Sequence, residues 1–183
     1  MGLNRAARRA DALAARTRQG ALGEQWTAGL LERLPAGWRV FHDLAVPGRR
    51  FNVDHLVVPP SGLGVIVLDS KKWHARYPTS VVRGRVHCGR QDRHEQVEAL
   101  AGYASAVAAR LGVPAAAVLP LMVVHGSPVV GGAVDVRVPA WEREVRVLGA
   151  ELLAPTLLRM PGGRDPVRAA ALARRVIERL PSA

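Results

Sequence analysis

The sequence predicts an α/β fold in which a mixed central sheet is flanked by helices. Short apolar runs rich in β-branched residues are bounded by Pro and Gly turn signals, as expected of buried strands. Longer segments repeat apolar residues every three to four positions, which is the spacing of amphipathic helices. The order is one helix, three strands, a small extra strand, a helix, two strands and two helices. This order favours a sheet with helices on its faces.

Two helical segments are expected at the start of the chain. Residues 3–19 mix alanine with five arginines, a composition that predicts an exposed helical arm with a basic face. Residues 22–34 place Leu22, Trp26, Leu30 and either Leu31 or Leu34 at helical spacing, which predicts one buried stripe.

Three strands should follow as an antiparallel meander over residues 38–46, 51–58 and 63–68. Pro47-Gly48 and the run Pro59 to Gly62 supply the turns between them. The third segment, Leu63 to Leu68, is apolar throughout and therefore reads as a central buried strand. A short half-exposed strand is expected over residues 81–88.

The second half of the chain begins with a long helix over residues 91–111, and Pro114 lies beyond its end. Apolar runs at 118–125 and 134–138 predict two more strands. Helices are expected at 151–160 and 165–180, with Pro161-Gly162-Gly163 between them.

Charge gives the first indication of a partner. The chain of 183 residues has 26 Lys and Arg against 15 Asp and Glu, a net charge of +11, and such an excess favours polyanions such as nucleic acid. Lys71 and Lys72 are its only lysines. It has no apolar run of the roughly 18 residues that span a bilayer and a single cysteine, Cys88, so we expect a cytoplasmic protein without membrane contact.

Two acids and a lysine are expected to meet on one face of the sheet. A hairpin with a two-residue turn pairs Asp54 with Asp69, and one with a four-residue turn pairs Asp54 with Val67. Because strand side chains alternate, both registers place the two acids on the same face, and Lys71 joins them. A register shifted by one residue would separate the acids.

The burial of this cluster suggests chemistry. Asp69 follows a run of apolar residues in a central strand, where an ionised carboxylate is costly unless it is paired or bound to metal. Hard carboxylate oxygens are the ligands of Mg²⁺, which also keeps waters and substrate phosphates. A lysine beside them can hold or deprotonate the attacking water and offset transition-state charge.

The chain resembles the nuclease-related domain, a branch of the PD-(D/E)xK phosphodiesterase superfamily with a restriction-endonuclease-like αβββαβ core. The matching segments lie between about residues 18 and 127. They are Gly20-Ala21-Leu22-Gly23-Glu24, Val53-Asp54-His55-Leu56-Val57-Val58, Gly62-Leu63-Gly64-Val65-Ile66-Val67-Leu68-Asp69-Ser70-Lys71, Trp73 and Gln96.

This resemblance implies roles for five residues. Asp54, Asp69 and Glu24 would bind Mg²⁺ or Mn²⁺, Lys71 would be the catalytic lysine, and Gln96 would orient substrate or water. Many members have Glu where this chain has Asp69, which changes the reach to the metal. Some also place a tyrosine soon after the helix glutamine, whereas Tyr103 lies seven residues after Gln96 but on the same helix face.

Together, composition, periodicity and the resemblance predict three parts: a basic helical arm (1–19), a nuclease-like domain (20–140) and a C-terminal helical extension packed on it (141–183). The expected activity is metal-dependent hydrolysis of nucleic acid, with DNA as the expected substrate. The alternative is a catalytically weak or inactive nuclease-fold module that binds DNA or RNA within a larger assembly. Protein partners or a homodimer are left open. Further nucleic-acid contacts are predicted at Trp73, Arg83, Arg85, Arg93 and Tyr103, with core packing or an exposed ribbon as the alternatives.

Overall fold

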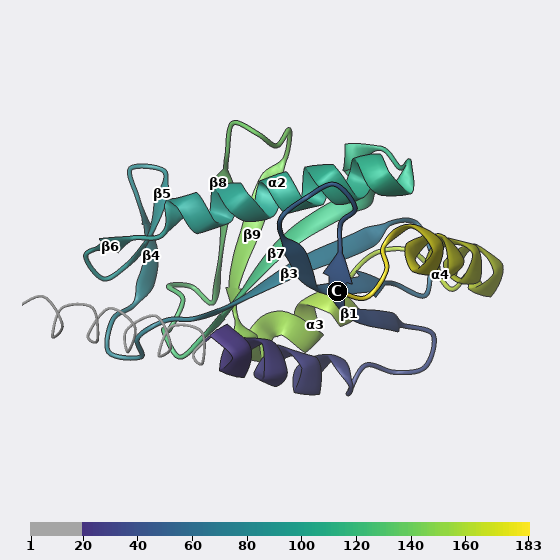
Figure 1. Cartoon of the computed structure of the whole chain (residues 1–183). Helices are drawn as coiled ribbons and strands as arrows, with labels where there is room; N and C mark the ends of the chain where they lie inside the picture. Colours follow the sequence, from purple (N-terminus) through teal and green to yellow (C-terminus); the bar gives the residue numbers. More distant parts are fainter. Residues whose placement is uncertain (1–19) are drawn as a thin grey trace, which may run out of the picture.

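The computed structural model describes residues 20–183, in which one mixed sheet lies between two layers of helices (Figure 1). The six strands of this sheet are, in spatial order, β1 (Arg39–Ala45), β2 (Asn52–Val58), β3 (Val65–Lys72), β7 (Val118–His125), β9 (Glu144–Gly149) and β8 (Ala133–Arg137). The predicted fold class is therefore confirmed. The predicted basic arm, residues 1–19, lies outside the described residues.

Helices cover both faces of the sheet (Figure 1). One face carries α2 (His94–Leu111) and α4 (Pro166–Arg179), and the other carries the first helix (20–31) and α3 (Leu153–Leu158). Short 3-10 turns, η1 (Ala115–Ala117) and η2 (Ala150–Leu152), lead into β7 and α3. A separate three-stranded sheet of β4 (Thr79–Val82), β5 (Arg85–Cys88) and β6 (Gln91–Asp92) projects between β3 and α2.

The predicted meander is present, since β1, β2 and β3 pair antiparallel in sequence order. After β3 the chain crosses over through α2, and β7 then pairs parallel to β3, with β9 parallel to β7. The β2–β3 register pairs Leu56 with Val67 and Val57 with Ile66. Leu56 and Val67 belong to the core beneath α2, whereas Val57 and Ile66 belong to the core beneath the first helix and α3.

The turn between β2 and β3 depends on a glycine. Gly62 has φ +60° and its N–H donates to Pro59 O at 2.9 Å. A Cβ on Gly62 would lie 2.4 Å from the backbone nitrogen of Ala169 in α4. Any side chain would therefore push α4 away from the turn.

Three sequence expectations need correction. Residues 144–149 form β9, a strand inside the sheet, although only helices were expected after residue 140. Residues 81–88 are not one strand, because the chain turns at Arg83-Gly84 between β4 and β5. The buried stripe of the first helix is also displaced: Leu22 and Trp26 are 37% and 45% exposed. Gly23, Thr27 and Leu31 are buried instead, because they face the sheet.

Candidate active site

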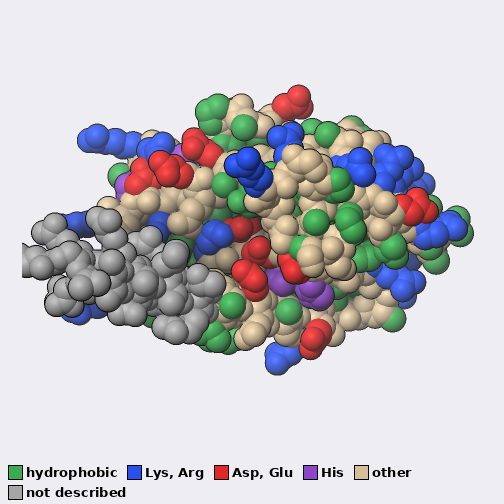
Figure 2. All heavy atoms as spheres, in the orientation of Figure 1, with side chains coloured by type: hydrophobic (Ala, Val, Ile, Leu, Met, Phe, Trp, Pro, Cys, Tyr) green, Lys and Arg blue, Asp and Glu red, His purple; other side chains and the backbone are tan. Residues whose placement is uncertain are grey.

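A cleft of about 990 Å³ opens at the end of β3, between the first helix and the start of α2. Its lining includes Glu24, Asp54, Lys71 and Gln96, four of the five residues predicted to carry the chemistry. The fifth, Asp69, is only 5% exposed and pairs with Lys71. Figure 2 shows acidic side chains gathered near the middle of one face of the molecule, with basic side chains largely around them.

The β2–β3 register sets the relation between the two aspartates. His55 of β2 pairs with Leu68 of β3, and each lies next to one of the two aspartates. Continuing this ladder by one position places Asp54 opposite Asp69, on the face that α2 covers. Asp54 Oδ2 accepts a hydrogen bond of 2.9 Å from the backbone N–H of Ser70, which holds its carboxylate against β3.

Lys71 neutralises the buried acid. Its Nζ lies 2.6 Å from Asp69 Oδ2, and the two side chains are 28% and 7% exposed. Within residues 20–183, Oδ2 has no hydrogen bond of good geometry, so this ion pair is its polar contact. The lysine thus closes over the carboxylate from the cleft side.

Glu24 reaches the cleft because the first helix runs close to β3. A Cβ on Gly23 would lie 3.6 Å from the backbone nitrogen of Lys72, so a small residue here lets the helix approach the strand. Partial burial, and then the charge of Asp54, raises the pKa of Glu24. The two carboxylates are therefore near enough to influence each other.

The acids of the cleft bind protons more strongly than exposed carboxylates. Burial raises the pKa of Asp69 to about 6, against the opposing charge of Lys71, and the charge of Asp54 adds to the rise. Burial also raises the pKa of Asp54, although the hydrogen bond from Ser70 opposes it. Burial disfavours the ammonium of Lys71, but its ion pair with Asp69 outweighs this effect and raises its pKa.

Two residues of α2 border the acids. Gln96 Oε1 accepts a hydrogen bond of 3.2 Å from Trp73 Nε1, which fixes the orientation of its amide. Tyr103 stacks on Phe51 with ring centroids 4.3 Å apart. Burial, and then the charge of Asp69, raises the pKa of Tyr103, so its hydroxyl lies within electrostatic reach of the site.

The other residues predicted to contact nucleic acid do not all lie in the cleft. Trp73 is 5% exposed and packs in the core, so its indole face is not open to a base. Arg93 lines the cleft, and its guanidinium carbon lies 5.9 Å from the centre of the Trp73 ring. Arg85 is paired with Asp92 at 2.6 Å, and Arg83 occupies the exposed tip of the β4–β5 turn with φ +51°.

The sequence did not predict a chain of hydrogen bonds between buried polar side chains behind the cleft. Ser70 Oγ donates to Thr27 Oγ1 at 2.8 Å, and Thr27 Oγ1 lies 2.8 Å from His125 Nε2. Burial lowers the pKa of His125, so a neutral ring is available as the acceptor. This chain joins the first helix to β3 and β7 and so fixes Glu24 relative to Lys71. Nothing in the sequence pattern marks these three residues, because they meet only when the helix docks.

The carboxylates of the site could supply the oxygen ligands that a divalent cation needs. Within residues 20–183, no three His, Cys, Asp or Glu side chains lie close enough together to surround a metal ion. Mg²⁺ does not need such a cage, since one or two carboxylates with waters and substrate phosphates usually hold it. Asp54 and Asp69 on one face, beside an open cleft, fit that requirement.

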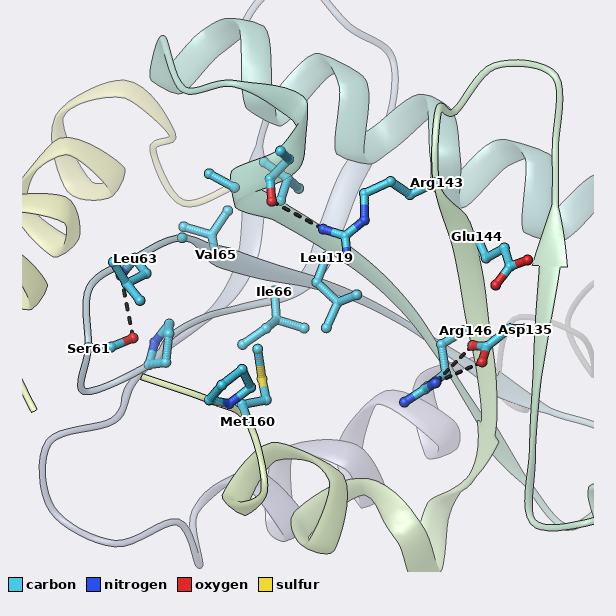
Figure 3. A pocket seen from close by; sticks show the side chains of 16 residues that line it. Ser61, Leu63, Val65, Ile66, Leu119, Asp135, Arg143, Glu144, Arg146 and Met160 are labelled. Atoms are coloured by element: carbon cyan, nitrogen blue, oxygen red, sulfur yellow. Dashed lines mark hydrogen bonds and ion pairs between the residues drawn. The ribbon is translucent and has the colours of Figure 1, made fainter. Parts of the chain in front are cut away.

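A different cavity lies at the opposite ends of β3 and β7 (Figure 3). It holds about 480 Å³ and is lined by apolar side chains such as Ile66, Leu119 and Met160. Its charged groups are already satisfied, because Arg146 binds Asp135 through two hydrogen bonds of 2.8 and 2.7 Å. We therefore place the functional site at the acidic cleft.

The mixed sheet, with paired acids and a lysine where β2 and β3 adjoin, is that of a restriction-endonuclease-like protein. A family model described as nuclease-related domain matches residues 19–125, more than half of the chain. The chain belongs to the nuclease-related domain family. Comparisons with curated proteins and with solved structures gave no match. No helix within residues 20–183 is both long and apolar enough to cross a membrane.

Proposed function

We propose that this protein is a metal-dependent nuclease that hydrolyses phosphodiester bonds in DNA, with Mg²⁺ or Mn²⁺ as its metal. Membership of the nuclease-related family supports the class of activity. The observation that carries the proposal is the register of β2 and β3, which puts Asp54 and Asp69 on one face beside Lys71. The excess of basic residues, +11 over the whole chain, supports an anionic substrate.

Asp54 and Asp69 would hold the metal, with Glu24 as a further carboxylate at the rim of the cleft. When bound, a divalent ion stabilises charge on the phosphate and lowers the pKa of a bound water. The raised pKa values of the acids suit this role, because a buried carboxylate without full compensation gains from a cation.

Lys71 acts as a charged hydrogen-bond donor in this proposal. Because its pKa is raised, the ammonium form predominates at neutral pH, so it donates to a phosphate oxygen and does not accept a proton from water. Gln96 uses its carbonyl for Trp73, which leaves the NH₂ end of its amide to orient the phosphate or the nucleophilic water. The Tyr103 hydroxyl provides a further donor near the same face.

We place this activity in the cytoplasm. Cys88, the single cysteine, is a buried free thiol, as suits a reducing compartment.

The test is cleavage of supercoiled plasmid and of single-stranded DNA by purified protein with Mg²⁺, Mn²⁺ or EDTA. We expect cleavage that requires the metal and falls about 100-fold or more in Asp69→Ala and Lys71→Ala. Asp135→Ala is the matched control, because this acid pairs with Arg146 and lines the apolar cavity, not the cleft. Cleavage by Asp69→Ala at the wild-type rate would reject the proposal.

A second candidate is a nuclease-fold module that binds nucleic acid without cutting it. The ion pair between Lys71 and Asp69 favours it, since a carboxylate neutralised at 2.6 Å by a lysine is less available to a metal. Salt-sensitive binding that persists in Asp54→Ala and Asp69→Ala, with no cleavage in either metal, would select this reading over the enzyme.

A further inference from the structure

A second hollow adjoins the candidate active site. It holds about 1100 Å³, and we call it the aromatic groove; it is defined by Trp26, Lys72, His74, Tyr77, Arg90 and Arg93. Lys72, Trp73, Gln91 and Arg93 line both this groove and the acidic cleft. The two hollows therefore adjoin, close enough for one nucleic-acid strand to contact both.

We propose that the aromatic groove binds unpaired bases of a single-stranded nucleic acid next to the phosphate in the cleft. The inference rests on the proposed function, because it assigns the substrate class of the same site. It concerns the strandedness of the substrate, which neither the fold nor the family fixes.

The first support is the exposure of two aromatic rings at one place. Trp26 is 45% exposed and Tyr77 is 48% exposed, and both line the groove. The whole chain has only four Trp, two Tyr and two Phe, so a quarter of its aromatic side chains stand open to solvent in one hollow. Large apolar rings left exposed in a cluster commonly mark a binding surface. Exposed aromatic faces stack on bases of any sequence.

The second support is that both rings are held in place before any ligand arrives. Lys72 Nζ lies 4.6 Å from the centre of the Trp26 ring, and the His125 ring lies 5.5 Å from it at an angle of 58°. Tyr77 contacts Gly89 so closely that a Cβ there would lie 3.0 Å from the tyrosine side chain. The backbone oxygen of Tyr77 accepts a hydrogen bond of 2.6 Å from Ser127 Oγ. Rings fixed in this way lose little freedom when a base stacks on them.

The third support is charge. Lys72, Arg90 and Arg93 border the groove, and its lining, which falls wholly in the described part of the chain, contains no acid. The neighbouring cleft differs from the groove in also holding three acids, Glu24, Asp54 and Asp92, beside its basic residues. A polyanion would therefore bind along the groove through its phosphates, while the cleft requires a cation to accept the same backbone.

Single strands fit this arrangement better than duplexes. In a duplex each base is stacked between its neighbours, so its faces are unavailable to Trp26 or Tyr77 unless the base is displaced at a cost of a few kcal/mol. Unpaired bases present those faces freely. The groove should thus favour single-stranded over double-stranded DNA of the same sequence.

The experiment measures binding without catalysis. Fluorescence anisotropy of a labelled oligodeoxynucleotide, single-stranded or annealed to its complement, is followed in EDTA with wild-type protein, Trp26→Ala and Tyr77→Ala. We expect each variant to weaken single-strand binding about tenfold, as base–aromatic stacking predicts, and to leave duplex binding nearly unchanged. Trp26→Phe should restore part of the loss. Leu63→Ala is the control, because Leu63 is 57% exposed but lines the distant apolar cavity.

Wild-type single-strand affinity in both alanine variants, with unchanged thermal unfolding, would overturn the aromatic groove as a base-binding site. An equal loss of duplex and single-strand binding would overturn it as well. Neither result touches the nuclease proposal, which depends on Asp69-dependent cleavage. Conversely, loss of single-strand binding in the two variants, in a protein that cuts nothing, would support the groove and reject the enzyme.

Discussion

The pair formed by Asp69 and Lys71 shows two opposing effects on the charge of one buried carboxylate. Burial favours the neutral acid, and the lysine at 2.6 Å favours the carboxylate. Burial has the larger effect, so the pKa of Asp69 is raised to about 6. At neutral pH the acid is thus ionised but held at a cost in folding free energy, which a cation in the cleft would reduce.

Removing the lysine should destabilise the metal-free protein in a pH-dependent way. In Lys71→Met the pKa of Asp69 rises further, because the charge that opposes burial is gone. An acid whose pKa is higher in the folded than in the unfolded state stabilises the fold fully below its unfolded pKa, and this contribution is lost as the pH rises through the folded value. We expect a loss of about 2 kcal/mol at pH 8, smaller than for a fully buried pair, and nearly none below about pH 4.

Urea denaturation in EDTA at the two pH values measures this effect. Lys72→Met is the matched control, since Lys72 lies over Trp26 and not against Asp69. A loss of stability that is the same at both pH values would show that Lys71 contributes by packing and not by pairing with Asp69.

The raised pKa of Asp69 also predicts how the rate of the proposed cleavage falls at low pH, which is the acid limb of its pH profile. If Asp69 binds the proposed metal, metal and proton compete for it, so cleavage should increase with pH through about 6, well above the ordinary range of an aspartate. Profiles of kcat/KM from pH 5 to 9 at two Mg²⁺ concentrations provide the measurement. A higher concentration should shift the limb to lower pH, and a limb that does not move would assign it to another group.

At the scale of elements, the β2–β3 hairpin carries most of the site, and its geometry could be predicted from the sequence. Either expected turn length keeps Asp54 and Asp69 on one face, and the structure adopts the register in which their neighbours His55 and Leu68 pair. Strand alternation was enough to predict the shared face, because burying the apolar side chains of both strands allows only one orientation of each strand.

Gly62 fixes this hairpin against α4 and offers a sharp comparison with a second glycine. Gly62→Ala should destabilise the protein by about 2–4 kcal/mol, because it combines a left-handed backbone with a clash against Ala169. Gly84 has φ +76° but nothing within 4 Å of its Cβ position, so Gly84→Ala should cost only about 1 kcal/mol. Urea denaturation compares the two, and equal losses would mean that α4 yields to the new side chain.

The misread elements have identifiable physical causes. The β4–β5 turn has positive φ at Arg83 and Gly84, a two-residue hairpin turn in which Asn-Gly or Asp-Gly is the usual signal. β9 alternates Val145 and Val147 with Glu144 and Arg146, a pattern that does indicate a half-buried strand, so this strand was predictable from the sequence. Trp26 was expected in the core because helical spacing identifies a stripe but not which neighbouring stripe meets the sheet. In the structure the stripe that meets the sheet is Gly23, Thr27 and Leu31.

Across the whole molecule, charge is unevenly arranged. The net charge is +11, and the cleft proposed to cut a polyanion is lined by three acids, Glu24, Asp54 and Asp92, and three basic residues, Lys71, Lys72 and Arg93. In the proposed function the basic residues of the cleft and of the aromatic groove would attract the substrate to the carboxylates. The burial of Asp69 and its pairing with Lys71 limit the repulsion that the backbone of the nucleic acid would meet.

The position of β9 in the sheet predicts that the independently folding unit extends beyond the segment matched by the family model. The segment matched by the family ends at residue 125, the last residue of β7, but one side of β7 is hydrogen-bonded to β9. A fragment of residues 20–125 would leave a buried central strand as an open edge. We expect this fragment to self-associate, whereas residues 20–183 should give a single folded species in size-exclusion chromatography with light scattering. A folded monomeric short fragment would contradict this.

The segment that the family model matches is therefore shorter than the segment that must be expressed as one chain for the sheet to be complete. Grafting residues 19–125 onto a relative, or expressing them alone, would separate the β2–β3 hairpin from β9, the strand that completes the sheet beside β7. Any chimera should therefore cross over after Gly149, where β9 ends, and not where the family resemblance stops.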